Sequence, residues 1–381
     1  MKALFVCPTL RIGGAERQWA ILVPALAARG IDVSVLVLQE DGPLAEVVRQ
    51  SGVSVVCARM RGRFDAIGIG RAVRLGGIPD IVITRSIDAH VLGHMVARRA
   101  RAPHVATEHT QYDLLPLRRH RAVLYRIVAP HVNLVVAVSS SQLDALRGLG
   151  YSDSSLNVIP NGVGDFCPQR SREEVRATLA IGDLEFLAVL VATLRPEKRA
   201  DIFVEAIMRA RRADDRIRGL IVGDGPEAPR VQALCASTDG SVLSVGARTD
   251  VADLVNAADA ACLTSAHEVM SMSLLEAAAL GKPLVATDVG GTRDIVRTGE
   301  TGYLVGVGDV EALAEALVAL ATDSETALAY GRRAREIQQL SFSADRMIDS
   351  YEMLLRSAVT GEIGSSIAAS SATRLTEDLL R

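Results

Sequence analysis

Short apolar runs alternate with longer amphipathic segments along most of the chain. The apolar runs are rich in Val, Ile, Leu and Ala and are bounded by turn-forming residues, so each predicts a β-strand buried on both faces. The runs are Ala3–Val6, Val33–Leu38, Ile81–Thr84, Leu134–Val138, Phe186–Ala192, Gly219–Val222, Ala260–Leu263 and Leu284–Thr287. Segments of helical period lie between them, among them Glu16–Arg29, Asp201–Arg212 and Val310–Ala321. This alternation predicts parallel sheets covered by helices on both faces.

The alternation restarts after a turn-rich stretch, Asn161–Asp165, which is followed by Pro168. A chain of 381 residues is long enough for two or three domains. We therefore predict two tandem doubly wound (Rossmann-like) α/β domains, residues 1–164 and 165–343. Residues 359–381 include a Ser- and Ala-rich stretch without periodicity and are predicted to form a surface tail.

The net charge of −3 hides an asymmetry between the two halves. Residues 1–165 carry 19 Lys and Arg against 13 Asp and Glu, a net charge of +6. The remainder carries 23 against 32, a net charge of −9, and such a difference is typical of two domains with different partners. Aromatic residues make up only 3% of the chain and do not interleave with the basic groups, so we expect no nucleic-acid partner.

The spacing of cysteine and histidine argues against several classes of site. The five cysteines are scattered without a C-x-x-C pair, so we expect neither disulfides nor a zinc site, and a reducing cytoplasm as the location. No apolar run is long enough to span a membrane, and the first strand is too short for a signal peptide. His267 and Glu268 do not continue to H-E-x-x-H, because residue 271 is serine. His90 and His94 share a helix face without a carboxylate at ligand spacing, so we expect a hydrogen-bonded pair near the surface.

Two glycine-rich turns follow predicted strands. Gly13 and Gly14 stand between a strand end and a helix start, where backbone can approach a ligand and the helix N-terminus attracts an anion. The alternative is a tight turn alone, and the spacing is not that of a dinucleotide fingerprint. Gly223–Pro226 follows a strand of the second domain and should bring backbone to the sheet edge where α/β proteins bind ligands.

Lysine is rare enough in this chain to be informative. Of 42 basic residues only Lys2, Lys198 and Lys282 are lysines. Lys198 follows the first strand of the second domain, and its compact charge suits phosphate, with Arg195 as a forked second donor. The alternative is a solvated charge cluster with Glu197.

Two carboxylates bracket the start of a predicted helix in the segment Ser265–Pro283. Ser271 or Ser273 can cap this helix, so that Glu268 lies in the loop before it and Glu276 about one turn inside. Such an arrangement suits a nucleotide sugar, with phosphates on the helix amides and hydroxyls on the two acids. The alternative for Glu276 is a charge that only complements the helix dipole.

Together these motifs resemble those of the retaining glycosyltransferases of family four, which have the GT-B fold. The resemblance covers roughly residues 1–358 and rests on GGAE, NGV at the boundary, RPEK, GDGP, and E-x(7)-E followed by AAALGKPLVATDVGG. It implies that the second domain binds a nucleoside-diphosphate sugar and that the first binds the acceptor. It also implies that a final helix, about 344–358, crosses back onto the first domain.

The resemblance also implies roles for individual residues. Arg195 and Lys198 would hold the diphosphate. Glu268 would hold hydroxyls of the donor sugar, and Glu276 those of the ribose. The other implied catalytic or donor-binding residues are Gly14 against the phosphate, His109 facing the transferred sugar, and Gly13, Gly223, Arg248, Met270, Ser271, Met272 and Ser273.

The sequence departs from the family pattern at three positions. Thr193 stands where many members have the phosphate-binding arginine. Val269 follows the first glutamate where glycine is common, and it would narrow the sugar pocket. Gly164 ends the boundary motif where aspartate is frequent. The first two departures leave the identity of the donor open but not the class of reaction.

The implied reaction is transfer of a sugar from a nucleoside diphosphate to an acceptor hydroxyl with retention of anomeric configuration. It requires no cofactor beyond the donor substrate and no metal. The acceptor would be a sugar, a lipid-linked molecule or another small molecule. Two alternatives stay open: a nucleotide-sugar 2-epimerase on the same fold, and a non-catalytic module that binds a sugar nucleotide.

Arginines of the first domain fall into groups, the densest of which lies in Leu114–Arg126. Basic and apolar residues interleave there at roughly helical spacing, so the segment can lie on an anionic membrane or meet an anionic acceptor. The alternative is a helix packed by Leu117, Val123 and Leu124 with its arginines in solvent.

We predict weak, salt-sensitive attachment to anionic lipid vesicles, which in the cell would place the protein on the inner face of the cell membrane. Replacing Arg118, Arg119 and Arg121 by Glu should abolish attachment, because each arginine near an anionic surface contributes about 1 kcal/mol. Co-sedimentation with anionic and neutral vesicles at low salt measures this. Equal binding to both kinds of vesicle would favour a soluble acceptor.

Overall fold

The computed structural model describes residues 1–11, 13–62, 65–109 and 119–361. Contacts divide the chain into two compact units, Met1–Gly162 with the segment from Ala344 onward, and Val163–Ser343. This division lies two residues before the boundary predicted between 164 and 165. The predicted tail falls almost entirely outside the described residues. Within the described part of the chain, no helix combines the length and the apolar character needed to cross a membrane.

The first unit is built on a seven-stranded parallel sheet in the order β3-β2-β1-β4-β5-β6-β7. Its strands are β1 (Lys2–Thr9), β2 (Asp32–Glu40), β3 (Ser54–Cys57), β4 (Ile81–Arg85), β5 (His104–Glu108), β6 (Leu134–Ala137) and β7 (Leu156–Val158). Its helices are α1 (Gly14–Ala28), α2 (Pro43–Gln50), α3 (Ala66–Leu75), α4 (Ile87–Ala100), α5 (Arg119–Val128), α6 (Leu143–Gly148) and α15 (Ala344–Thr360). The chain moves outward in one direction after β1 and in the other after β4, so the strand order reverses between these two neighbours.

Side chains of the first sheet alternate between two cores. Phe5 of β1 packs with residues of α1, α2 and α15 on one face. Its neighbours Leu4 and Val6 pack with residues of α3 and α4 on the other face. Burial on both faces explains why the sequence pattern in these strands is a continuous apolar run rather than an alternation.

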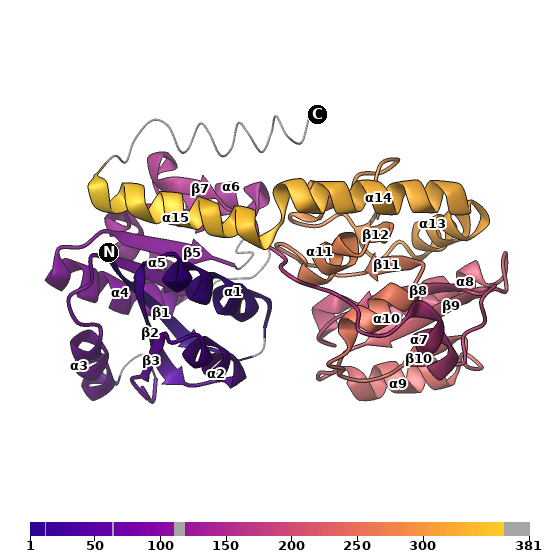
Figure 1. The fold of residues 1–381 in the computed structure, drawn as a ribbon, viewed down its shortest axis with the longest axis horizontal. Coiled ribbons are helices and arrows are strands. Elements are labelled where there is room, and N and C mark those ends of the chain that lie inside the picture. Colours follow the sequence, from indigo (N-terminus) through magenta and orange to yellow (C-terminus); the bar gives the residue numbers. More distant parts are fainter. Residues whose placement is uncertain (12, 63–64, 110–118, 362–381) are drawn as a thin grey trace. The chain divides into compact units, whose positions relative to one another are not determined.

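The last helix that the structure describes, α15, belongs to the first unit, where it packs against α1 (Figure 1). Tyr351, Leu354 and Leu355 of α15 are buried in the same core as β1. Arg29, which follows α1, pairs with two carboxylates of α15, at 2.6 Å from Asp349 and 2.9 Å from Glu352. The first unit is therefore closed by residues more than 300 positions away along the chain.

The second unit is built on a six-stranded parallel sheet in the order β10-β9-β8-β11-β12-β13. Its strands are β8 (Phe186–Val191), β9 (Ile217–Val222), β10 (Val242–Ser244), β11 (Ala260–Leu263), β12 (Leu284–Thr287) and β13 (Gly302–Val305). Its helices are α7 (Arg172–Thr178), α8 (Ala200–Ala210), α9 (Ala228–Ala236), α10 (Val251–Ala257), α11 (Met272–Ala279), α12 (Thr292–Ile295), α13 (Val310–Thr322) and α14 (Ser324–Ser341). Here the strand order reverses between β8 and β11.

The two units confirm the predicted fold class of two tandem doubly wound α/β domains, and all eight predicted strands are present. The sequence pattern missed β3, β5, β7, β10 and β13. Of these, β5 is buried throughout but carries His104, Thr107 and Glu108, whose polarity hid the strand.

Candidate functional site

Lys198 and Glu268 come together where the strand order of the second sheet reverses. Lys198 ends a short 3₁₀ turn after β8, and Glu268 lies in the loop after β11. The Lys198 Nζ atom and the Glu268 Oε2 atom form an ion pair, with 22% and 15% of the two side chains exposed. An open α/β sheet binds its ligands at such a reversal, so these two residues mark the candidate site of the second unit.

The two loops that carry this ion pair are also joined through their backbones. The hydroxyl of Thr264 donates to the carbonyl oxygen of Lys198 at 2.9 Å. The amide of Ala266 donates to the carbonyl oxygen of Glu197 at 2.8 Å. These bonds fix the loop after β8 on the loop after β11 and so hold the lysine and the glutamate in place.

A glycine pair after β12 supports the Glu268 loop from behind. The amide of Gly291 donates to the carbonyl oxygen of Val269 at 2.8 Å. Gly290 has a φ of +51°, and a Cβ atom there would lie 1.8 Å from the carbonyl oxygen of Glu268. Only glycine allows this approach, because any side chain would push the Glu268 loop out of position.

Helix α11 presents its N-terminus beside this loop. Ser271 is the N-cap residue, and its Oγ atom accepts from the amide of Leu274 at 3.4 Å and contacts the hydroxyl of Ser273 at 3.1 Å. The first turn of α11 contains no acidic residue. Glu276 lies further along α11 and is buried, with 8% exposure. The positive end of this helix dipole is therefore not matched by an acid of its own first turn.

The predicted turn Gly223–Pro226 packs behind the loop after β8. Gly223 has a φ of +145°, and a Cβ atom on it would lie 1.8 Å from the carbonyl oxygen of Ala192. The amide of Leu194 donates to the carbonyl oxygen of Asp224 at 2.9 Å. Gly223 thus supports the loop that carries Arg195 and Lys198.

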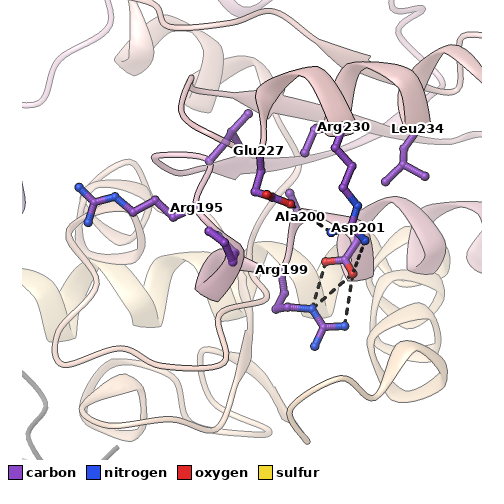
Figure 2. Close-up of a pocket in the computed structure, with 10 residues that line it drawn as sticks. Arg195, Arg199, Ala200, Asp201, Glu227, Arg230 and Leu234 are labelled. Carbon is purple, nitrogen blue, oxygen red and sulfur yellow. Dashed lines mark hydrogen bonds and ion pairs between the residues drawn. The ribbon is translucent and has the colours of Figure 1, made fainter. Parts of the chain in front are cut away.

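Arg195 and Arg248 are not part of the Lys198–Glu268 ion pair. The Arg195 side chain is 61% exposed and extends away from the pair formed by Arg199 and Asp201 (Figure 2). It borders a hollow of about 280 Å³, partly open to solvent, whose other charged residues pair with one another. Arg248 forms a two-bond pair with Asp250, at 2.7 and 2.8 Å, which raises the pKa of the arginine.

Of the remaining predicted site residues, Met270 is buried just before the cap of α11 and Met272 is the first residue of that helix, whereas the others lie in the first unit. Gly13 and Gly14 are the N-cap and first residues of α1. His109 follows β5 and is half-buried, and burial together with the nearby charge of Arg85 lowers its pKa to about 3. His109 is therefore neutral at physiological pH.

The expectation of a surface pair between His90 and His94 is wrong. His90 is completely buried, and its Nε2 atom lies 3.0 Å from Glu108 while its Nδ1 atom lies 2.6 Å from the hydroxyl of Thr84. His94 instead stacks on His131. The sequence spacing missed Glu108 because β5 brings it to the helix from 18 residues away. Across the described residues, no group of three or more His, Cys, Asp or Glu side chains is placed to hold a metal ion.

Sequence reasoning also missed Thr264, Gly290 and Arg85. Thr264 and Gly290 act through the backbone of loops distant in sequence, so no local motif identifies them. Arg85 lies at the end of β4 and is only 5% exposed. A buried arginine has no compositional signal in a chain with 39 arginines.

Two family models match the chain, one on each unit. The model described as Glycosyltransferase Family 4 matches residues 12–164. The model described as Glycosyl transferases group 1 matches residues 185–323. Together the matches take up more than three quarters of the chain.

Individual relatives are distant. The chain is 28% identical over 277 residues to an N-acetyl-alpha-D-glucosaminyl L-malate synthase of Bacillus anthracis, covering 71% of this chain and 72% of the relative. It is 29% identical over 246 residues to a D-inositol 3-phosphate glycosyltransferase of Rhodococcus opacus (strain B4), and this match spans 60% of the chain but only 54% of the relative.

Among solved structures, HepE of Anabaena, crystallised with UDP, superposes with a TM-score of 0.84 at 22% identity. The superposition covers 94% of this chain and 100% of HepE, so the two proteins share the whole two-domain fold. With the two family models matching in order on the two units, the chain belongs to the glycosyltransferases of the GT-B fold.

Proposed function

We propose that this protein transfers a sugar from a nucleoside-diphosphate sugar to an acceptor hydroxyl, with retention of anomeric configuration and without a metal ion. The observation that carries the proposal is the Lys198–Glu268 pair at the strand reversal of the second sheet, beside the N-terminus of α11. A cation next to a helix N-terminus can bind a diphosphate. The carboxylate beside that cation can accept hydrogen bonds from sugar hydroxyls.

When the donor binds, its diphosphate replaces Glu268 as the partner of Lys198. Lys198 pairs with Glu268, and a diphosphate carries more charge than the single carboxylate that it would replace. Once Lys198 turns to the phosphate, Glu268 is free to accept hydrogen bonds from the donor sugar. Arg195, whose side chain is 61% exposed, adds a second donor for the phosphate, and Glu276 binds the ribose.

Catalysis then rests on stabilising the leaving diphosphate. Charge builds up on the leaving group as the bond to the sugar breaks, and Lys198 together with the α11 amides is preorganised to receive it. The acceptor hydroxyl attacks from the face that the diphosphate leaves, and the leaving phosphate takes up its proton. This route preserves the anomeric configuration without an enzyme nucleophile.

The relatives suggest where a search for substrates should begin. HepE is crystallised with UDP, so uridine nucleotides are the first donors to examine.

The basic segment predicted to contact a membrane, Leu114–Arg126, is described only in part, because the residues from Leu114 to Arg118 lie outside the described part of the chain. In the described remainder of that segment, Val123 and Ile127 of α5 are 51% and 58% exposed, which supports the proposed contact of the first unit with a membrane surface.

Replacing Lys198 by Ala should lower turnover at least 10²–10³-fold, the usual effect of losing one preorganised charge donor. The assay follows isotope-labelled sugar from the donor into a panel of acceptors. Arg209→Ala, which removes an exposed arginine paired with Glu311, serves as the control and should leave turnover unchanged. Near-normal turnover in the Lys198 variant would contradict the assignment, and an isomerised donor formed without acceptor would identify an epimerase instead.

Variants of Glu276 and Glu268 should affect the binding of different ligands. Glu276→Gln should weaken binding of the free nucleoside diphosphate about tenfold, because it removes the charged partner of the ribose. Glu268→Gln should not weaken that binding and should strengthen it, since it removes the carboxylate that competes with the diphosphate for Lys198, but it should abolish use of the sugar donor. Calorimetric titration with UDP and with UDP-sugars measures both. Equal loss of UDP binding in the two variants would refute this division of roles.

Gly290→Ala should disable the donor site through the backbone alone. The new Cβ atom would collide with the carbonyl oxygen of Glu268, whereas Gly299→Ala, at a similar positive φ of +86°, meets no atom within 4 Å. Both variants should lose about 1 kcal/mol of stability from backbone strain, and the Gly290 variant should lose more because its Cβ atom must displace the Glu268 loop. Only the Gly290 variant should also lose the rise in Tm that a UDP-sugar produces, and a rise equal to that of the Gly299 variant would show that the glycine does not support the site.

A further inference from the structure

The strand reversal of the first sheet holds a buried arginine that reaches across it. Arg85, the last residue of β4, donates from Nη2 to the carbonyl oxygen of Thr9 at the end of β1, at 2.9 Å. The same nitrogen lies 3.2 Å from Glu16 in the first turn of α1. The guanidinium also lies over the ring of Trp19, 5.3 Å from its centroid. Arg85 is thus fixed from three sides at the position where an open α/β sheet binds ligands.

Three polar atoms at this edge of the sheet are buried without a partner among the residues that the structure describes. They are Nη1 of Arg85, Oγ of Ser86 and Nε2 of His109. Arg85 ends β4, Ser86 directly follows it, and His109 follows the neighbouring strand β5. The charge of Arg85 is close enough to His109 to lower the pKa of the histidine. Buried polar atoms without partners are rare and costly in native proteins, so a group of three suggests that a ligand completes them.

Ser86 lacks the hydrogen bond that its position in the helix would normally give it, and its backbone conformation is uncommon. As N-cap residue of α4 it would ordinarily accept a hydrogen bond from the helix, but its side chain makes no such bond. Its φ of +74° is uncommon for serine, and such conformations gather at ligand sites. The Oγ atom is therefore held away from its usual local partner.

We propose that Arg85 and Ser86 form an acceptor-binding subsite at the strand reversal of the first sheet, and that this subsite takes an uncharged sugar or polyol through its hydroxyl oxygens. The inference rests on the proposed transfer reaction, in which the first unit binds the acceptor. Arg85 Nη1 is a donor only, so the ligand atom that meets it is an oxygen that accepts. Ser86 Oγ accepts or donates and completes the recognition of a neighbouring hydroxyl.

The charges around Arg85 favour a neutral ligand. Glu16 already pairs with the guanidinium, and Asp88 places a second carboxylate in the first turn of α4. His109 adds no positive charge, because it stays neutral above about pH 4. Both helix N-termini at this edge thus have acids of their own, whereas the first turn of α11 on the donor side has none. A phosphate or carboxylate placed here would face two carboxylates, and a hydroxyl would not.

One corner of this subsite is open to solvent. Gly14 is exposed, and 23% of the Glu16 side chain is accessible. The Glu16 carboxylate packs over Gly13, where a Cβ atom would lie 2.4 Å from its Oε2 atom.

The test compares uncharged sugars with their phosphate esters by saturation-transfer NMR on the full chain. The probes are methyl α-glucoside, N-acetylglucosamine and myo-inositol, each with its phosphate monoester, together with L-malate. We expect saturation transfer to uncharged compounds and at least tenfold weaker binding of their charged counterparts. Stronger binding of the phosphate esters or of malate, or no binding of any uncharged probe, would overturn the proposal.

Two variants assign the binding to these residues. Ser86→Gly removes Oγ and relieves the positive φ, so its Tm should not fall, yet sugar binding should weaken about tenfold. Arg85→Lys keeps the charge beside Glu16 but loses the second donor nitrogen, and it should weaken binding to a similar degree. Ala180→Gly relieves a φ of +52° in the second unit and is the control, with sugar binding unchanged. Unchanged sugar binding in the Ser86 variant would refute the subsite.

A UDP titration of the same proteins keeps the two proposals apart. UDP should raise the Tm of the wild type and of all three variants equally, because none of them touches the Lys198–Glu268 pair. If no nucleoside diphosphate stabilises the wild type, the proposed transfer reaction fails whatever the sugars do. If UDP stabilises the protein but the uncharged sugars do not bind, only the acceptor subsite fails.

Discussion

Parallel strands deliver all of their carboxyl ends to one edge of a sheet, and each sheet of this protein reverses its strand order once along that edge. The loops on either side of a reversal run in opposite directions, so they cannot close over the gap between them. Arg85 spans the gap between β1 and β4, and the Lys198–Glu268 pair spans the gap between β8 and β11. Both of these contacts depend on this constraint of topology, because no local sequence motif would bring their residues together.

The two reversals differ in how their charges are arranged. In the second unit, a lysine and a helix N-terminus without an acid in its first turn lie beside one partly exposed carboxylate. In the first unit, the arginine is buried and both helices begin with acids of their own. The same architecture thus offers positive potential at one edge and a balanced, hydrogen-bonding surface at the other. This contrast is opposite in sign to the net charges of the two halves of the sequence, which are +6 for residues 1–165 and −9 for the remainder.

The fold was largely predictable from the sequence because fully buried strands leave continuous apolar runs. The exceptions have physical reasons: β5 is polar since Glu108 and His104 take part in a buried hydrogen-bond network with Thr84 and His90, and β7 and β10 are only three residues long. Lys198 and Glu268 were identified singly, but their contact was not, because 70 residues separate them and only the adjacency of β8 and β11 joins them. The loop supports at Thr264 and Gly290 act through carbonyl groups, which every residue has, so residue type gives no signal there.

Because the first unit needs helix α15, it can complete its core only late in the synthesis of the chain. Its buried residues, such as Leu355, complete a core whose other members lie within the first 160 residues of the chain. A ribosome therefore releases the whole second unit before the first can finish its core. During that interval the side chains of α1 that α15 covers are exposed, and the second unit, which is continuous in sequence, is the earlier of the two able to become complete. The amino-terminal unit of this protein is thus the last to be finished.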